Sequence, residues 1–97
     1  MFTSKQRATL RGIAQTIEPI GQIGKGGLSD NMIKSFSDAL ESRELIKLTL
    51  LNNSDEDIKS VAVELAEKLS AEVVCTIGHK IVLYRRSNKK GITHLKF

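Results

Sequence analysis

The sequence predicts an α/β (α+β) fold of two layers, in which helices pack on a mixed four-stranded sheet in the order α-β-α-β-α-β-β. Segments with helical periodicity alternate with short apolar runs that are typical of strands. Two strand-like runs follow each other late in the chain, separated only by Gly78-His79, which indicates a hairpin. The 97 residues suffice for a single hydrophobic core. We therefore expect one domain over residues 1–86, followed by a basic tail, residues 87–97, that is mobile in isolation.

The first helix is predicted to begin at a cap, Thr3 or Ser4, and to run to about Ile17. Its apolar residues recur at helical spacing and form one stripe: Leu10, Ile13, Ala14 and Ile17. Pro19 is expected to end this helix, because a residue that precedes proline is disfavoured in the α region. The apolar run 20–23 is then predicted to be a strand.

The middle of the chain predicts a second helix and a buried strand. Ser29 is a suitable N-cap for a helix over about 30–42, and Leu28 and Ile33 are placed to pack together across its first turn. The helix directs a set of apolar side chains toward a core: Met32, Ile33, Phe36, Ala39 and Leu40. The apolar run 44–51 is typical of a well-buried strand.

A third helix and a hairpin complete the predicted domain. Ser54 is expected to cap the helix, with three acidic residues, 55–57, in its first turn. Its apolar positions are the most regular in the chain: Ile58, Val61, Ala62, Leu65, Ala66 and Leu69. The runs 72–77 and 80–86 are predicted to pair antiparallel, whereas the first two strands should be parallel through a right-handed crossover.

The charged residues are segregated along the chain. The net charge is +4, with +3 over residues 1–29, −5 over 30–79 and +6 over 80–97. Basic ends around an acidic middle are expected when one face meets a polyanion. No apolar run is long enough to span a membrane, the first residues are too polar for a signal peptide, and the chain has one cysteine. We expect a cytoplasmic protein with no membrane partner.

The segment Gly24-Lys25-Gly26-Gly27 joins the first predicted strand to the second helix. Its glycines permit positive φ, its backbone N–H groups can form an anion-binding nest, and the helix N-terminus adds partial positive charge. With the ammonium of Lys25, this arrangement favours a phosphate. A tight turn with a solvated lysine is an equally good interpretation of the loop alone. The spacing matches neither a nucleoside-triphosphate loop nor a dinucleotide fingerprint.

No constellation of residues indicates catalysis. His79 and His94 lack a partner at a spacing suited to a triad or a metal site, and Ser29 has no base nearby in the sequence. The helix dipole explains the acidic run 55–57, and Cys75 is expected to be a small buried apolar residue. We therefore predict no enzyme, no cofactor and no metal site. Few aromatic residues are available for stacking on bases, which favours recognition of phosphates and shape.

Three segments together resemble the signature of a known family: Gly24-Lys25-Gly26-Gly27-Leu28-Ser29, Glu44-Leu45-Ile46-Lys47-Leu48 and Ile77-Gly78-His79-Lys80-Ile81-Val82-Leu83-Tyr84-Arg85. Over about residues 3–86 the chain is similar to the CRM (chloroplast RNA splicing and ribosome maturation) domain, whose stand-alone bacterial form is the YhbY-like protein. The resemblance implies a fold similar to the C-terminal domain of bacterial translation initiation factor three. It also implies RNA binding through the GxxG loop, comparable to the loop of KH domains, and association with precursors of the large ribosomal subunit.

The predicted RNA-binding residues fall into two groups. The motif supplies Gly24, Lys25, Gly26 and Gly27. Charge alone adds Lys5, Arg7, Arg11, Lys34, Arg85 and Arg86. The resulting hypothesis is a monomer that binds the backbone of structured ribosomal RNA, with ribosomal proteins as further partners.

Two alternatives remain open at this point. A protein–protein adaptor would use the acidic faces of the second and third helices to dock on ribosome assembly or translation factors. A nucleotide-handling enzyme would use the glycine loop but lacks an acid–base pair. The substitution Lys25→Glu should weaken RNA binding, and an adaptor should tolerate it.

Overall fold

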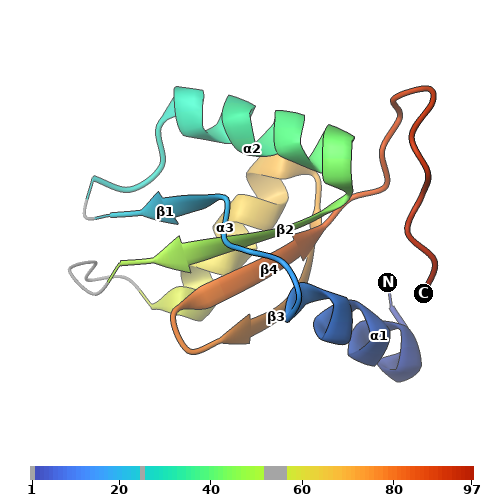
Figure 1. The fold of residues 1–97 in the computed structure, drawn as a ribbon. Helices are drawn as coiled ribbons and strands as arrows, with labels where there is room; N and C mark the ends of the chain where they lie inside the picture. The colour runs from blue at the N-terminus through green and yellow to red at the C-terminus, as the bar shows by residue number, and fades with distance from the viewer. Residues whose placement is uncertain (1, 25, 52–56) are drawn as a thin grey trace.

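The structure, a computed structural model, describes residues 2–24, 26–51 and 57–97. Its elements follow the predicted order: α1 (Ser4–Ala14), β1 (Gly21–Ile23), α2 (Asp30–Arg43), β2 (Leu45–Leu50), α3 (Ile58–Leu69), β3 (Glu72–Ile77) and β4 (Lys80–Tyr84). The strands form one sheet in the order β1-β2-β4-β3 (Figure 1). Strand β1 pairs parallel with β2, and β4 pairs antiparallel with both β2 and β3. The predicted α+β class, the mixed four-stranded sheet and the strand directions are confirmed.

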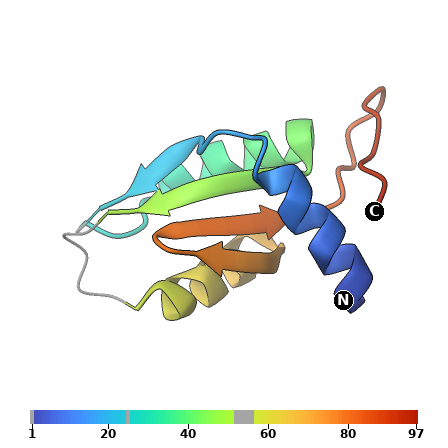
Figure 2. The same cartoon turned by 60° about the horizontal axis from the view of Figure 1, so that its bottom comes forward.

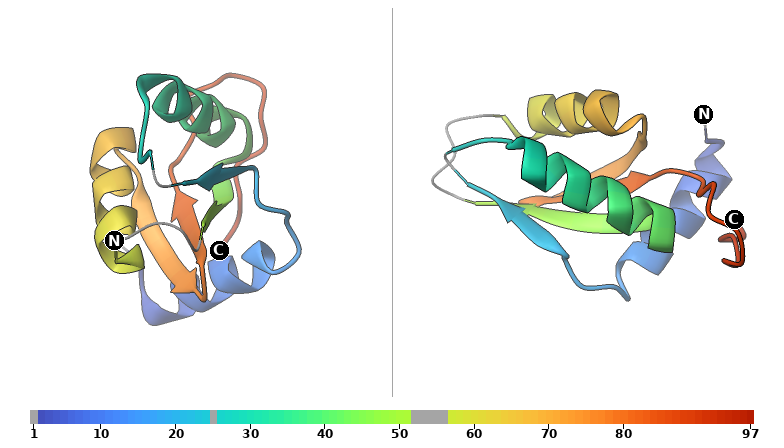
Figure 3. Two further views of the ribbon diagram at one scale, coloured as in Figure 1. Left: turned by 90° about the vertical axis from the view of Figure 1, so that its left-hand side faces the viewer. Right: turned by 90° about the horizontal axis from the view of Figure 1, so that it is seen from above.

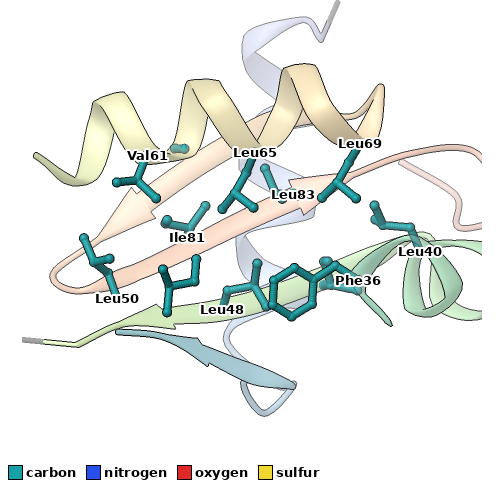
Figure 4. Close-up of a cluster of buried hydrophobic side chains, with 12 residues drawn as sticks. Phe36, Leu40, Leu48, Leu50, Val61, Leu65, Leu69, Ile81 and Leu83 are labelled. Atoms are coloured by element: carbon teal, nitrogen blue, oxygen red, sulfur yellow. The ribbon is translucent and has the colours of Figure 1, made fainter. Parts of the chain in front are cut away.

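The larger core lies between one face of the sheet and helices α2 and α3. Alternate residues of β2, namely Ile46, Leu48 and Leu50, point to this face. They meet Phe36 and Leu40 of α2, the apolar stripe of α3, and residues of β4 (Figure 4). The apolar residues predicted for α2 and α3 all belong to this cluster or pack against it. Burial of these two helical stripes therefore fixes both helices on the same face.

Helix α1 packs on the opposite face of the sheet. Leu10 and Ala14 are fully buried there against Leu45, Val74 and Val82. Figures 2 and 3 show α1 crossing the end of the sheet at which β4 finishes, away from α2 and α3. The helix thus adds a partial third layer to the two-layer arrangement that the sequence predicts. No helix in the described part of the chain is both long and apolar enough to cross a membrane.

Two predicted helix boundaries are corrected. Helix α1 ends at Ala14 rather than near Ile17, because the hydrogen bonds after it tighten to i→i−3 turns: the N–H groups of Thr16 and Ile17 donate to the carbonyls of Ile13 and Ala14 at 3.0 and 3.4 Å. The Lys47 ammonium caps this end, donating to the carbonyls of Ala14 at 3.0 Å and Ile17 at 3.4 Å. Helix α3 is capped by Asp57, whose carboxylate accepts from the Ser60 N–H at 3.3 Å. The predicted cap at residue 54 lies outside the described residues and before this start.

The residues that follow β4, which the sequence predicts to be a mobile tail, contact the domain through Glu44. Glu44, which the sequence places in a strand, instead ends α2 at a φ of +64° and is buried. Its carboxylate accepts hydrogen bonds from the N–H groups of Ser87 at 2.7 Å and Leu95 at 2.8 Å, and lies 2.5 Å from Nδ1 of His94. Leu95 and Phe97 also pack against the buried cluster between α1 and the sheet. The tail folds back because a buried carboxylate organises it.

The stability of the folded protein is expected to fall as the pH is lowered below about 4.5, the ordinary pKa of a glutamate. Burial disfavours ionisation of Glu44, but hydrogen bonds from Ser87, His94 and Leu95 outweigh burial and lower its pKa. A lowered folded-state pKa contributes stability above the unfolded-state pKa, which is lost as the pH falls through the folded-state value. Urea unfolding between pH 7 and pH 3 measures this loss. The variant Glu44→Gln should lose less stability over the same range, and an identical loss in both proteins would contradict the assignment.

Candidate nucleic-acid interface

The glycine loop forms a tight turn between β1 and α2. The Gly27 N–H donates to the Gly24 carbonyl at 3.0 Å, and Gly27 has a φ of +73°, which favours glycine. The Leu51 N–H donates to the Ile23 carbonyl at 2.8 Å and so ties the start of the loop to the end of β2. Lys25 lies outside the described residues. The turn thus has a defined backbone on both sides of the motif lysine.

The loop leads directly into the N-terminus of α2. The Ser29 hydroxyl accepts from the Met32 N–H at 3.1 Å, as predicted for an N-cap, and the Ser29 carbonyl accepts from the Ile33 N–H at 3.0 Å. In the first turn of any helix, N–H groups such as those of Asp30 and Asn31 have no intrahelical acceptor. Asp30 also places a carboxylate in this turn. The helix therefore offers backbone donors beside one negative charge.

The turn is open toward solvent. A side-chain Cβ built at Gly26 or Gly27 would meet no atom within 4 Å, and Gly26 is exposed. A bulky ligand can therefore approach the backbone closely at Gly26. Of the loop N–H groups predicted to form an anion-binding nest, that of Gly27 instead donates to the Gly24 carbonyl.

The turn between β3 and β4 lies at the same end of the sheet as the glycine loop. The Leu50 N–H donates to the His79 carbonyl at 2.7 Å, and Lys80 pairs with Thr49 in the sheet. His79 is exposed there. We call the glycine loop, the start of α2 and the turn with His79 and Lys80 the loop end. His79 and Lys80 are not among the predicted RNA-binding residues, although both lie in the third segment that carries the family resemblance.

The other predicted basic residues are spread over the molecule rather than gathered around the loop. Ile23 pairs beside Leu50 at the loop end of β2, and Leu45 pairs with Tyr84 at the other end. These two ends of β2 are about 17 Å apart, which is five steps along a strand. Arg86 follows β4 and is exposed beyond this far end. Lys5 and Arg11 are exposed on α1, and Lys34 is exposed on α2. The nine predicted residues that the structure describes do not form one patch.

Arg85 and Arg7 make contacts inside the protein. The Arg85 guanidinium donates to the carbonyls of Leu69 at 2.7 Å and Ser37 at 2.9 Å, and pairs with Glu41 at 3.3 Å. Nη1 of Arg7 donates to the carbonyls of Val73 and Val74 of β3. The Arg7 guanidinium also lies 5.6 Å from the ring centre of Phe2. These contacts give both arginines a structural role that their sequence positions alone did not indicate.

Comparison with known proteins places this architecture in a family. A family model of the CRS1 / YhbY (CRM) domain matches residues 2–85. The chain belongs to this family. It is 48% identical over 92% of its length to the "Probable RNA-binding protein YqeI" of Bacillus subtilis, and covers 93% of that protein. It is 31% identical over 94% of its length to the "RNA-binding protein" of Haemophilus influenzae, of which it covers 92%.

A solved structure agrees with this assignment. The solution structure of a Staphylococcus aureus protein, described as a candidate RNA-binding protein, superposes with a TM-score of 0.78. The two chains are 49% identical, and the match covers 93% of this chain and 94% of the other. This CRM domain therefore has the same fold as the Staphylococcus aureus protein.

The candidate catalytic groups of this CRM domain are dispersed. His79 is exposed at the loop end, while His94 is held by Glu44 beyond the opposite end. Burial raises the pKa of the Cys75 thiol, and the positive charges of Arg11 and Arg7 offset this effect in part. Within residues 2–24, 26–51 and 57–97, no three His, Cys, Asp or Glu side chains are grouped so that they could hold a metal ion.

Proposed function

We propose that this CRM-domain protein binds structured RNA, specifically ribosomal RNA in precursors of the large ribosomal subunit, through the loop end. The observation that carries the proposal is the open glycine turn at the N-terminus of α2, where Gly26 meets no neighbouring atom that would block a ligand. Membership of the CRM family and the names of the bacterial relatives support RNA as the ligand. We assign no catalytic step to the protein.

The proposed mechanism is recognition of the RNA backbone. The Gly26 N–H and the N–H groups of the first turn of α2 hold a phosphate, and Lys25 neutralises its charge. Lys34 on α2 and Lys80 beside the turn extend the positive surface along the strand of RNA. Ionic contacts to phosphates carry no sequence information, so specificity depends on the shape of the RNA.

The salt dependence of binding tests this mechanism. If Lys25, Lys34 and Lys80 each neutralise one phosphate, the logarithm of the binding constant should fall with the logarithm of the salt concentration at a slope of about −2 to −3. Filter binding to ribosomal RNA across a salt series measures the slope, with transfer RNA as the non-specific control. Equal affinity for both RNAs would contradict ribosomal RNA as the specific target. An affinity independent of salt would contradict recognition through phosphates.

The variant Lys25→Glu separates RNA binding from a protein–protein adaptor. The substitution should weaken binding to ribosomal RNA. It should also reduce the salt slope by about one or more, because at least one contact to a phosphate is lost. An adaptor that docks through the acidic faces of α2 and α3 would not respond. In addition, two acidic side chains at the C-terminal end of α2, Glu41 and Glu44, accept hydrogen bonds from N–H groups of the tail. Fewer acidic side chains are then left to bind a protein partner.

A further inference from the structure

Three of the chain's four aromatic residues gather beyond the end of the sheet opposite the loop end. Phe2 comes before α1, Tyr84 ends β4 and Phe97 lies in the tail. The ring centres of Tyr84 and Phe97 are 5.0 Å apart, and each lies 5.7 Å from the ring centre of Phe2. All three pairs meet edge to face. The aromatic residues that are scattered in the sequence thus form one cluster, which we call the aromatic cluster.

A cavity of about 390 Å³ opens beside the aromatic cluster. Its wall includes the three rings together with the polar side chains of Gln6, Ser70 and Arg86. Glu72 adds a carboxylate, so the wall carries both signs of charge. The volume lies in the range of small-molecule sites, which combine apolar walls with a few polar groups.

The chemistry of this wall suits a nucleotide. A base can stack on an aromatic ring and form hydrogen bonds with neighbouring polar groups. The exposed guanidinium of Arg86 can pair with a phosphate. The Tyr84 hydroxyl is protonated at neutral pH and can donate a hydrogen bond, and burial and the carboxylate of Glu44 raise its pKa further.

We propose that the cavity beside the aromatic cluster binds one unpaired nucleotide of the RNA, with its base on the rings and its phosphate on Arg86. This inference rests on the proposed function. The cavity and the loop end lie beyond opposite ends of β2, which itself spans about 17 Å. The protein would then contact a paired segment at the loop end and a neighbouring extruded nucleotide at the cavity. This second contact adds a preference for an extruded nucleotide to the recognition of the RNA backbone at the loop end.

Tyrosine fluorescence of the wild-type protein reports directly on this site. The chain contains one tyrosine, Tyr84, and no tryptophan. A base stacked beside Tyr84 is expected to quench its emission. We would titrate the protein with a hairpin from ribosomal RNA that carries one bulged nucleotide in its stem, and with a hairpin that has the same loop and a fully paired stem. Quenching by the bulged hairpin alone supports the proposal, and equal spectra at saturation with both hairpins overturn it.

Affinities of matched variants provide the second test. Phe97→Ala should weaken binding of the bulged hairpin about fivefold to thirtyfold and leave the paired hairpin within about twofold. Val63→Ala removes apolar atoms from an exposed side chain elsewhere, on α3, and should change neither affinity. Circular dichroism melting confirms that each variant is folded.

The outcomes distinguish this proposal from the proposed function. If wild type binds both hairpins with the same affinity and Phe97→Ala changes nothing, the aromatic cluster serves only as packing, and binding through the loop end stands. If neither hairpin binds above the level of transfer RNA, the proposed function and this inference fail together.

Discussion

Replacing Gly26 with aspartate is expected to weaken binding of ribosomal RNA about tenfold to hundredfold, or ~1.4–2.8 kcal/mol. The new carboxylate would stand where the proposed phosphate approaches the backbone, and two like charges about 4 Å apart repel by about 1–4 kcal/mol between the dielectric of water and that of a protein surface. Because a Cβ at Gly26 meets no atom within 4 Å, the substitution should leave the fold intact. Fluorescence anisotropy with a labelled fragment of ribosomal RNA measures the loss.

Asparagine at the same position is the matched control. Gly26→Asn has nearly the same shape as Gly26→Asp but carries no charge, so it should weaken binding only a few-fold. The difference between the two variants should shrink at high salt, because salt screens exposed charges. Equal affinities of the two variants would show that no phosphate lies at Gly26 and would contradict the loop mechanism.

The sequence was sufficient wherever a local pattern decides the structure. The cap at Ser29, the apolar stripes of α2 and α3, and the hairpin around Gly78-His79 all depend on residues within a few positions of one another. The glycine motif likewise lies within a single turn, so its position between β1 and α2 follows from the flanking elements. Whether that turn binds RNA depends on a partner that no local pattern specifies.

The sequence was insufficient where distant residues meet. Lys47 of β2 donates to a carbonyl at the end of α1, and the Glu44 carboxylate accepts a hydrogen bond from Ser87, some forty residues later. The aromatic cluster joins residues from both ends of the chain. Charge alone could not show which arginines face solvent, because a guanidinium that binds backbone carbonyls looks the same in sequence as one that binds phosphate.

Arg85 provides the largest expected effect on stability. Replacing it with alanine should lower the free energy of unfolding by about 3 kcal/mol, the usual scale for removing one partner of a partly buried charged network. Its guanidinium joins the carbonyls of Leu69, at the end of α3, and Ser37, in α2, and it is only 18% exposed. Without it, these carbonyls lose their charged donor. For a domain of this size the melting temperature should fall by about 12–24 °C.

Lysine at position 85 and alanine at position 86 separate stability from RNA binding. Arg85→Lys keeps the charge but has one ammonium in place of the planar fork that reaches both carbonyls, so it should recover only part of the stability. Arg86→Ala removes an exposed neighbour and should change stability by less than about 0.5 kcal/mol. It should nevertheless reduce the salt slope of RNA binding by about one. If Arg85→Ala were instead as stable as wild type and lost RNA affinity, the guanidinium would be a phosphate ligand, as its charge alone suggests.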